Sequence, residues 1–265
     1  VPRVAEGAQY LPISTSEAVY YERTYKRGWQ WDLTFEAYMD SGRTVGSALQ
    51  GVPEAWGYSA RYTQEYVATS AYAGCYTGGP GEVTTFFTDA QTNRGTAVLS
   101  NTSFDAAKVI LRGLPDPAGN VSPYLGGFTL VVPPALMRTA RVILESEALS
   151  RIATSDNVGT YNPERGTARL VENAFLPEID TTNGDTAWYV FCNPIERPAL
   201  RYGYLRGYES PEIWVREPDV RALNGAAASP YDGSFLVDGV AFKLRMTFGA
   251  DRVDWRGAYC STGNP

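Results

Sequence analysis

The sequence contains no histidine among its 265 residues, and this absence limits its chemistry more than any residue that is present. Histidine is the usual general base near neutral pH and completes Ser-His-Asp and Cys-His catalytic sites. Those nucleophilic sites are therefore excluded, together with metal sites built on imidazole ligands. Any chemistry would have to come from carboxylates, thiols or amines.

Closely spaced carboxylates are the first candidates for catalysis. Two pairs stand close in the sequence: Glu145 with Glu147, and Asp251 with Asp254. A glycoside hydrolase needs two carboxyl groups at a defined separation, which a sequence does not give. Because scattered Asp and Glu residues are mostly solvated, the sequence favours a protein without enzyme activity.

Metal and cofactor sites have little support. Asp180 and Asp185 flank an Asn-Gly turn and could hold calcium, but the spacing of an EF-hand loop is absent. The glycine-rich segment 78–81 lacks the Lys-Ser/Thr pair of a phosphate-binding loop. We therefore assign no catalytic, cofactor-binding or metal-binding residue and expect no cofactor.

The three cysteines are far apart in the sequence and odd in number. No pair has the spacing of a zinc or redox site, so neither a disulfide framework nor a zinc site is indicated. We expect reduced thiols at all three positions: Cys75, Cys192 and Cys260.

The composition sets broader limits. A net charge of −6 and a pI near 4.9 argue against a sequence-independent DNA binder, which would present a basic face. No apolar run approaches the ~18 residues that cross a bilayer, so a soluble protein is expected. A hydrophobic content of 44% suits one large domain or two intertwined lobes with a sizeable core.

The clearest structural signal is the run Phe128–Val132, which predicts a short strand buried on both faces. Pro133 and Pro134 fit the last extended and the first helical position, where a missing N–H costs little. The residues that follow have helical spacing and predict a helix with one buried face. That face comprises Leu136, Ala140, Ile143, Leu144 and Ala148.

Two further helices are predicted. The longest covers Pro53–Ala73 and is closed by Gly74, and its tyrosines on several sides indicate contacts on several faces. A second covers Ser103–Arg112, with Asn101 or Thr102 as its cap. Phe104, Ala107, Lys108 and Leu111 fall on one side of this helix.

Strand-forming runs suggest two hairpins. Near the N-terminus, Val19–Tyr21 and Trp29–Tyr38 flank a basic tip at Arg23–Gly28. Farther along, Asn-Gly separates Ala168–Ile179 from Thr186–Cys192 and predicts a second hairpin.

The last third of the chain contains further strand-like runs. In Val240–Phe248 apolar and polar residues alternate, so one face is expected to be buried while the other carries Lys243 and Arg245. The remaining runs are Leu200–Leu205, Glu212–Glu217, Phe235–Val237 and Arg252–Tyr259.

Two segments carry a family resemblance: LVVPPALMRTARVILES (130–146) and NPIERPALRYGYLRGYESPEIWVREPD (193–219). With the capped helix before them, they follow the order seen in the major head (capsid) subunits of tailed bacteriophages, from about Glu17 to Tyr259. The chain most closely resembles the Mu-like gpT major head subunit family. This resemblance implies an α+β, HK97-like phage coat fold.

The resemblance also implies a division of the chain. Residues 1–16 would form an N-terminal arm, 17–45 an extended β-hairpin loop (E-loop), and 46–100 a peripheral (P) domain with a long spine helix and a β-sheet. Residues 101–207 would form the axial (A) domain, and 208–265 would return to the P-domain. Without the resemblance, a hairpin that belongs to the core of its own chain would be the preferred interpretation of this segment.

The implied function is that of a major capsid protein. Such subunits self-assemble into pentamers and hexamers of an icosahedral head that encloses double-stranded DNA without sequence-specific binding and without a membrane. The implied location is the virion, after assembly in the host bacterial cytoplasm. Portal, decoration and scaffold proteins or a maturation protease are implied partners. An acidic shell is compatible with this role because a wall that repels phosphate does not hold the packed genome.

Alternatives remain open on sequence alone. One is an encapsulin-like protein compartment with the same fold and no genome. Another, from a different class, is a carbohydrate-active enzyme or binding module rich in Tyr and Trp. Some coat proteins crosslink a loop lysine to an asparagine of a neighbouring copy. Lys26 lies at a suitable position, but no matching acid and asparagine pattern can be aligned.

Overall fold

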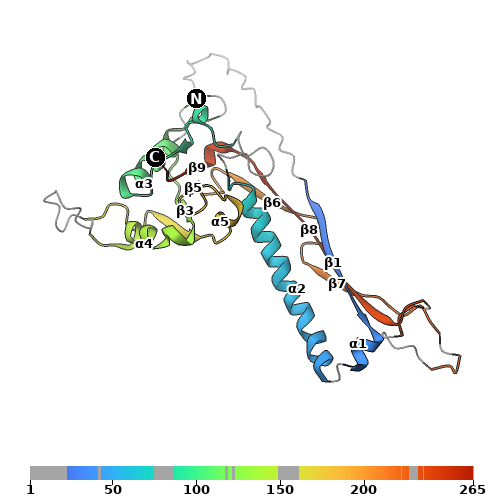
Figure 1. The fold of residues 1–265 in the computed structure, drawn as a ribbon. Helices are drawn as coiled ribbons and strands as arrows, with labels where there is room; N and C mark the ends of the chain where they lie inside the picture. Colours follow the sequence, from blue (N-terminus) through green and yellow to red (C-terminus); the bar gives the residue numbers. More distant parts are fainter. Residues whose placement is uncertain are drawn as a thin grey trace, which may run out of the picture.

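The computed structural model describes residues 23–40, 43–74, 86–116, 119–120, 123–148, 161–221, 223–226, 232–234 and 236–264. Helices and strands are mixed, which confirms the predicted α+β class. Figure 1 shows a body from which a long helix and several strands project to one side. Within the described residues the strands form two sheets, here called the body sheet and the projecting sheet.

The body sheet has the strand order β2-β9-β5-β3-β4. These strands are β2 (Arg94–Gly95), β9 (Ala258–Ser261), β5 (Trp188–Cys192), β3 (Phe128–Val132) and β4 (Ala168–Glu172). β3 runs parallel to β4 and antiparallel to β5, while β9 is antiparallel to β5 and parallel to β2. The surrounding helices and 3-10 turns are η2 (Asp89–Gln91), α3 (Asn101–Gly113), η3 (Pro134–Leu136), α4 (Met137–Glu145), α5 (Leu176–Ile179) and η5 (Trp255–Gly257).

Both faces of the body sheet are buried. Leu130 and Val190 enter a core beneath α3 and α4. Their neighbours Val131 and Tyr189 enter a second core on the opposite face, which includes Phe87 and part of α5. Each strand thus supplies two cores, which explains its consecutive apolar residues.

The strand-to-helix unit forms as predicted. β3 is buried on both faces, and Pro133 is extended (φ −70°, ψ 163°) immediately before η3, which leads into α4. The buried side chains of α4 are Ala140, Ile143 and Leu144, with Leu136 partly buried beside them. The prediction for Ala148 is wrong, because α4 ends at Glu145 and Ala148 is an exposed residue bridged to Tyr161.

The four residues expected on one side of helix α3 do share a side, and the structure shows that all four are buried, including Lys108. Its cap is Ser100 rather than Asn101 or Thr102, because Ser100 and Ser103 exchange hydrogen bonds in a capping box.

Lys108 lies against the carboxylate of Glu164, and both side chains are only 5% exposed. The ammonium also lies 5.1 Å from the centre of the Phe104 ring, and the Thr167 hydroxyl donates to Glu164 at 3.1 Å. This buried ion pair attaches α3 to the segment that precedes β4.

The projecting sheet is organised around β8 (Gly239–Arg252). β1 (Tyr25–Thr34) pairs antiparallel with one side of β8, and β6 (Leu200–Tyr204) and β7 (Glu212–Val215) pair antiparallel with the other. As predicted, alternate β8 residues are buried and Lys243 is exposed. The buried ones are Val240, Leu244, Met246 and Phe248.

Helix α2 (Arg43–Ser70) covers part of this sheet (Figure 1), with Ala60 packed on Leu244 and Met246. It begins ten residues before the predicted start at Pro53. The turn that follows α2 ends at Gly74, which has the positive φ of +72° expected of a helix-closing glycine.

The first predicted hairpin differs from the structure at its tip and at the end of its second run. Residues Tyr25–Gly28, predicted as part of the tip, lie within β1 and pair with β8. Val19–Tyr21 lies outside the described residues. Phe35–Asp40 forms the short helix α1 rather than the end of a strand, since the Thr34 hydroxyl accepts the N–H of Ala37. β8 offers partners to every residue of β1, more than a short local run could supply.

The second predicted hairpin is also wrong, because β3 lies between β4 and β5 and pairs with both. The Asn-Gly stretch forms a turn in which Asp180 Oδ1 accepts the N–H groups of Thr182 (3.1 Å) and Asn183 (3.0 Å). The turn signal was correct, but the pairing depended on a third strand.

The late strands are divided between the sheets, since β8 lies in the projecting sheet and β9 in the body sheet. Arg252–Tyr259 is not one strand as predicted. Asp254 caps η5 by accepting the N–H of Arg256 at 3.0 Å, and β9 begins only after this turn. The described part of Phe235–Val237 is not a strand.

The buried pair Lys108 and Glu164 leads to a prediction about stability. Lys108→Met should lower the unfolding free energy of the unassembled chain by about 3–5 kcal/mol, because it leaves the Glu164 carboxylate buried without a cation. The double variant Lys108→Met/Glu164→Leu should recover much of this loss. Urea unfolding measures both, and equal losses in the single and double variants would contradict the prediction.

Stability should also fall in alkaline solution. Burial raises the pKa of the Cys192 thiol from 9.0 to about 11, and burial raises the pKa of Tyr124 from 10.0 to about 12. The folded state therefore disfavours deprotonation, so this stabilisation is complete below pH 9 and is lost as pH rises toward 11 and 12.

Urea unfolding between pH 8 and 11 measures this loss, which should amount to about 1–3 kcal/mol for the thiol. Cys192→Ala should show a smaller decline over the same interval. A decline of the same size in this variant would assign the effect to other groups.

Candidate functional site

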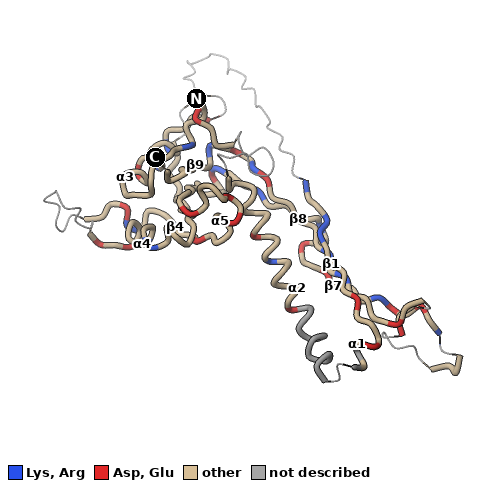
Figure 2. The backbone as a smooth tube through the Cα atoms, viewed as in Figure 1, with Lys and Arg blue, Asp and Glu red and all other residues tan. Residues whose placement is uncertain are grey.

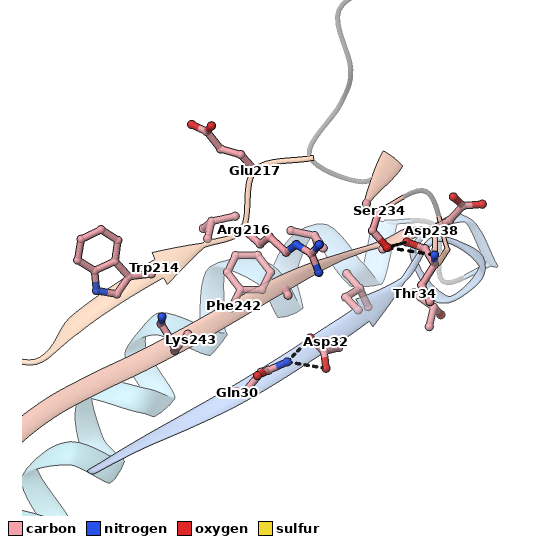
Figure 3. Close-up of a pocket in the computed structure, with 17 residues that line it drawn as sticks. Gln30, Asp32, Thr34, Trp214, Arg216, Glu217, Ser234, Asp238, Phe242 and Lys243 are labelled. Carbon is pink, nitrogen blue, oxygen red and sulfur yellow. Dashed lines mark hydrogen bonds between the residues drawn. The ribbon is translucent and has the colours of Figure 1, made fainter. Parts of the chain in front are cut away.

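The projecting sheet presents a polar face on the side away from α2. Residues directly opposite on antiparallel strands share a face, and Gln30, Lys243 and Trp214 form such a row across β1, β8 and β7. Figure 3 shows these side chains around a groove of about 630 Å³. The Gln30 amide donates to both carboxylate oxygens of Asp32 at 3.1 Å.

Arg245 is held in place on the same face. Its guanidinium donates to Glu212 from Nη2 at 2.6 Å and from Nε at 3.1 Å, and this hydrogen bonding raises the pKa of Arg245. It also lies 5.1 Å from the Tyr208 ring centre and 5.5 Å from that of Trp214. Trp214 remains half exposed despite this contact.

The opposite face is apolar but only partly covered. In the row Trp29, Leu244 and Ile213, the central Leu244 is 2% exposed beneath α2, whereas Trp29 is 64% and Ile213 42% exposed. A helix is about 10 Å wide and strands lie about 4.8 Å apart, so one helix cannot cover the whole sheet. We call the projecting sheet together with α1 and α2 the projecting unit. Other large apolar residues that the projecting unit leaves exposed are Tyr25, Met39, Tyr202, Tyr204 and Val215.

Hydrogen bonds fix α2 to the body. The Tyr62 hydroxyl donates to both oxygens of Glu178 at 2.9 Å, which raises the pKa of Tyr62. The Asn173 amide donates to Thr69 and to the Tyr72 hydroxyl, each at 2.7 Å. The first turns of α2 extend beyond these attachments.

The outer side of β1 is an open edge within the described residues, since β1 pairs there with β8 alone. At the end of this ladder the N–H of Phe35 donates to Asp238 O at 3.2 Å. Hydrogen-bonded pairs alternate in antiparallel ladders, so the odd-numbered residues of β1 bond to β8. The main-chain groups of Lys26, Gly28, Gln30 and Asp32 therefore face outward.

Charge is distributed unevenly over the molecule. Figure 2 shows Lys and Arg gathered along β1 and β8, although the chain carries a net charge of −6. The projecting strands are thus more basic than the protein as a whole.

The carboxylates proposed from sequence do not form a shared site. Glu145 is the last residue of α4 and is exposed. The other three each lie beside an arginine: Glu147 with Arg165 at 3.2 Å, Asp251 with Arg252 at 3.9 Å, and Asp254 with Arg256 at 3.2 Å.

The remaining candidate residues are placed as follows. Cys192 and Cys260 are free and buried, and Asp180 shapes its turn. Lys26 is exposed in β1 opposite Thr247. Cys75 and residues 78–81 lie outside the described residues. Over the part of the chain that is described, no helix combines the length and apolarity needed to cross a membrane.

Sequence reasoning missed several functional contacts. The spacing placed Lys108 on the same side as Phe104 and Leu111, but nothing in the sequence identified Glu164 as its buried partner. The alternation in β8 placed Arg245 on the polar face, yet its contact with Glu212 depended on the pairing of β7. The open edge of β1 could not be seen while its partner was thought to be local.

The chain is similar in sequence and in fold to phage capsid proteins. A family model described as phage capsid protein matches residues 20–261. No curated protein matches the chain. The capsid of Myoviridae phage XM1 is similar at 12% identity, over 91% of this chain and 74% of that chain, with a TM-score of 0.51.

Two other capsids are similar over nearly the whole chain. One is the satellite phage P4 procapsid, solved with its size determination (Sid) protein. It is 12% identical over 99% of this chain and 84% of the procapsid chain, with a TM-score of 0.46. The cyanophage P-SCSP1u capsid has 11% identity, covers 97% and 80%, and has a TM-score of 0.47.

The similarity to the XM1 capsid agrees with an HK97-like α+β coat fold. The family match spans most of the chain and does not favour a genome-free compartment or a carbohydrate-active protein. The chain therefore belongs to the phage capsid protein family and is a major capsid protein, a structural subunit of a phage shell.

Proposed function

We propose that copies of this chain assemble as pentamers and hexamers into an icosahedral head that encloses double-stranded DNA. The observation that carries this proposal is the projecting unit, whose large apolar side chains are uncovered in a single copy. Neighbouring copies would bury them. Each contact need contribute little, because many symmetric contacts act together in a closed shell.

The proposed division of the chain follows the coat fold. Residues 1–16 form the N-terminal arm, 17–45 the E-loop segment, 46–100 the P-domain with α2 as spine helix, and 101–207 the A-domain. Residues 208–265 return to the P-domain, with β9 reaching the body sheet. Both β1 and α2 project away from the body, and this supports the division, because an E-loop and a spine helix would both extend toward neighbouring subunits.

The proposal also covers the subfamily, the place of assembly and the partner proteins. Among coat proteins, we place the chain with the Mu-like gpT major head subunits, on the strength of the ordered segments 130–146 and 193–219. Assembly would take place in the host bacterial cytoplasm, with portal, decoration, scaffold or protease partners. The acidic net charge supports a DNA-enclosing wall that does not bind its contents. A protein without catalytic activity is expected.

Electron microscopy of the purified full chain tests the proposal. Closed particles with five- and six-fold clusters are expected, and particles from infected cells should contain double-stranded DNA. A monomer of 29.0 kDa at every concentration would overturn the assembly. Closed particles that never contain nucleic acid would instead favour a compartment.

A surface variant tests the role of the uncovered apolar face. Val215→Asp should abolish particle formation while leaving the melting temperature of the unassembled chain nearly unchanged, because Val215 is 51% exposed in a single copy. Val215→Thr, with the same shape, is the matched control and should assemble. Assembly of the aspartate variant at wild-type concentrations would remove Val215 from the contact surface.

A further inference from the structure

The open edge of β1 suggests how two copies meet. An unpaired strand edge offers main-chain donors and acceptors to another chain, and natural proteins block it with charged side chains, proline, bulges or a covering element. β1 contains no proline, no bulge interrupts its pairing with β8, and no element covers its outer side within the described residues. It does carry charges, and their order along the strand decides whether they block a second copy.

Charge along β1 is complementary to itself. Lys26 and Asp32 lie on the polar face, opposite Thr247 and Ala241 of β8, so neither meets a charge across its own sheet. Within the described chain neither forms an ion pair, and Asp32 accepts only from Gln30. In an antiparallel pair of identical strands, the basic Lys26 of each copy would therefore lie near the acidic Asp32 of the other.

We propose that β1 pairs antiparallel with β1 of a second copy across a two-fold axis, joining two projecting sheets into one. This inference rests on the proposed function and specifies one of its contacts. In the register that we infer, Trp29 lies opposite Trp29 of the second copy. Lys26 then lies opposite Asp32, and Gly28 opposite Gln30. A shift of two residues in either direction removes both charge pairs.

The inferred register uses the outward-facing groups. Lys26, Gly28, Gln30 and Asp32 form the hydrogen-bonded positions, giving about eight main-chain hydrogen bonds across the axis. Trp29 occupies a non-hydrogen-bonded position, where side chains lie closest. The pairing thus satisfies an edge that a single copy leaves open.

The apolar face gains partners in the same arrangement. Trp29 is 64% and Tyr25 51% exposed in a single copy, and each would gain a cross-strand neighbour from the second copy: Trp29 for Trp29 and Leu33 for Tyr25. Arg27 would lie opposite Trp31 of the second copy.

Charge exchange tests the register. Lys26→Asp or Asp32→Lys alone places like charges opposite each other twice at each axis. Each variant should raise the concentration needed for assembly about tenfold. The double variant restores opposite charges and should assemble within about twofold of the wild type. Single variants that assemble normally, or a double variant as impaired as the singles, would overturn the inference.

A cysteine at the axis provides an independent test in assembled particles of the full chain. Under mild oxidation Trp29→Cys should yield a disulfide-linked dimer on a non-reducing gel, because identical residues face each other at disulfide distance. Tyr25→Cys, exposed on the same face but opposite Leu33 of the second copy, is the matched control. Wild-type particles control for the native cysteines.

Dimers from Trp29→Cys alone would support the pairing. Equal crosslinking of the two variants, or none in intact particles, would overturn it. If neither cysteine variant assembles, the charge exchange decides. A wild-type chain that never assembles would instead refute the proposed function, and the inference with it.

Discussion

The projecting unit depends on the alternation of side chains along β8. Its buried residues anchor α2, and its opposite face carries Lys243 and Arg245. Because the side-chain period of a strand is two, a slip of one residue would turn Leu244 and Met246 toward water. The pairing of β1, β6 and β7 with this one strand therefore fixes which residues face solvent across the whole projection.

The body and the projecting unit differ in how far their apolar side chains are covered. In the body, helices and aromatic residues cover both faces of the sheet, so the unit is self-sufficient. In the projection, one helix covers a sheet that is wider than itself, and Trp29 and Ile213 remain in solvent. A single chain therefore has one part with a complete core and one part with an incomplete core. The incomplete part is the one whose exposed surface suits assembly.

Sequence predicted most reliably where the determining contacts were local. The β3–α4 unit, the grouping of four residues on one side of α3 and the alternation in β8 followed from spacing alone. Pairing was predicted poorly, because a hairpin signal identifies a turn but not a strand that intervenes from elsewhere in the chain. β3 separates β4 from β5 in this way, and β1 pairs with the distant strand β8. The open edge that follows was invisible for the same reason.

The pairing of β1 with β8 also has a consequence for synthesis. The two strands are separated by about 200 residues, so β1 leaves the ribosome long before its partner exists. During translation the projecting sheet cannot close, and its edge cannot adopt the shape in which another subunit would meet it. A chain whose synthesis has not yet reached β8 therefore lacks the ordered edge that another subunit would meet.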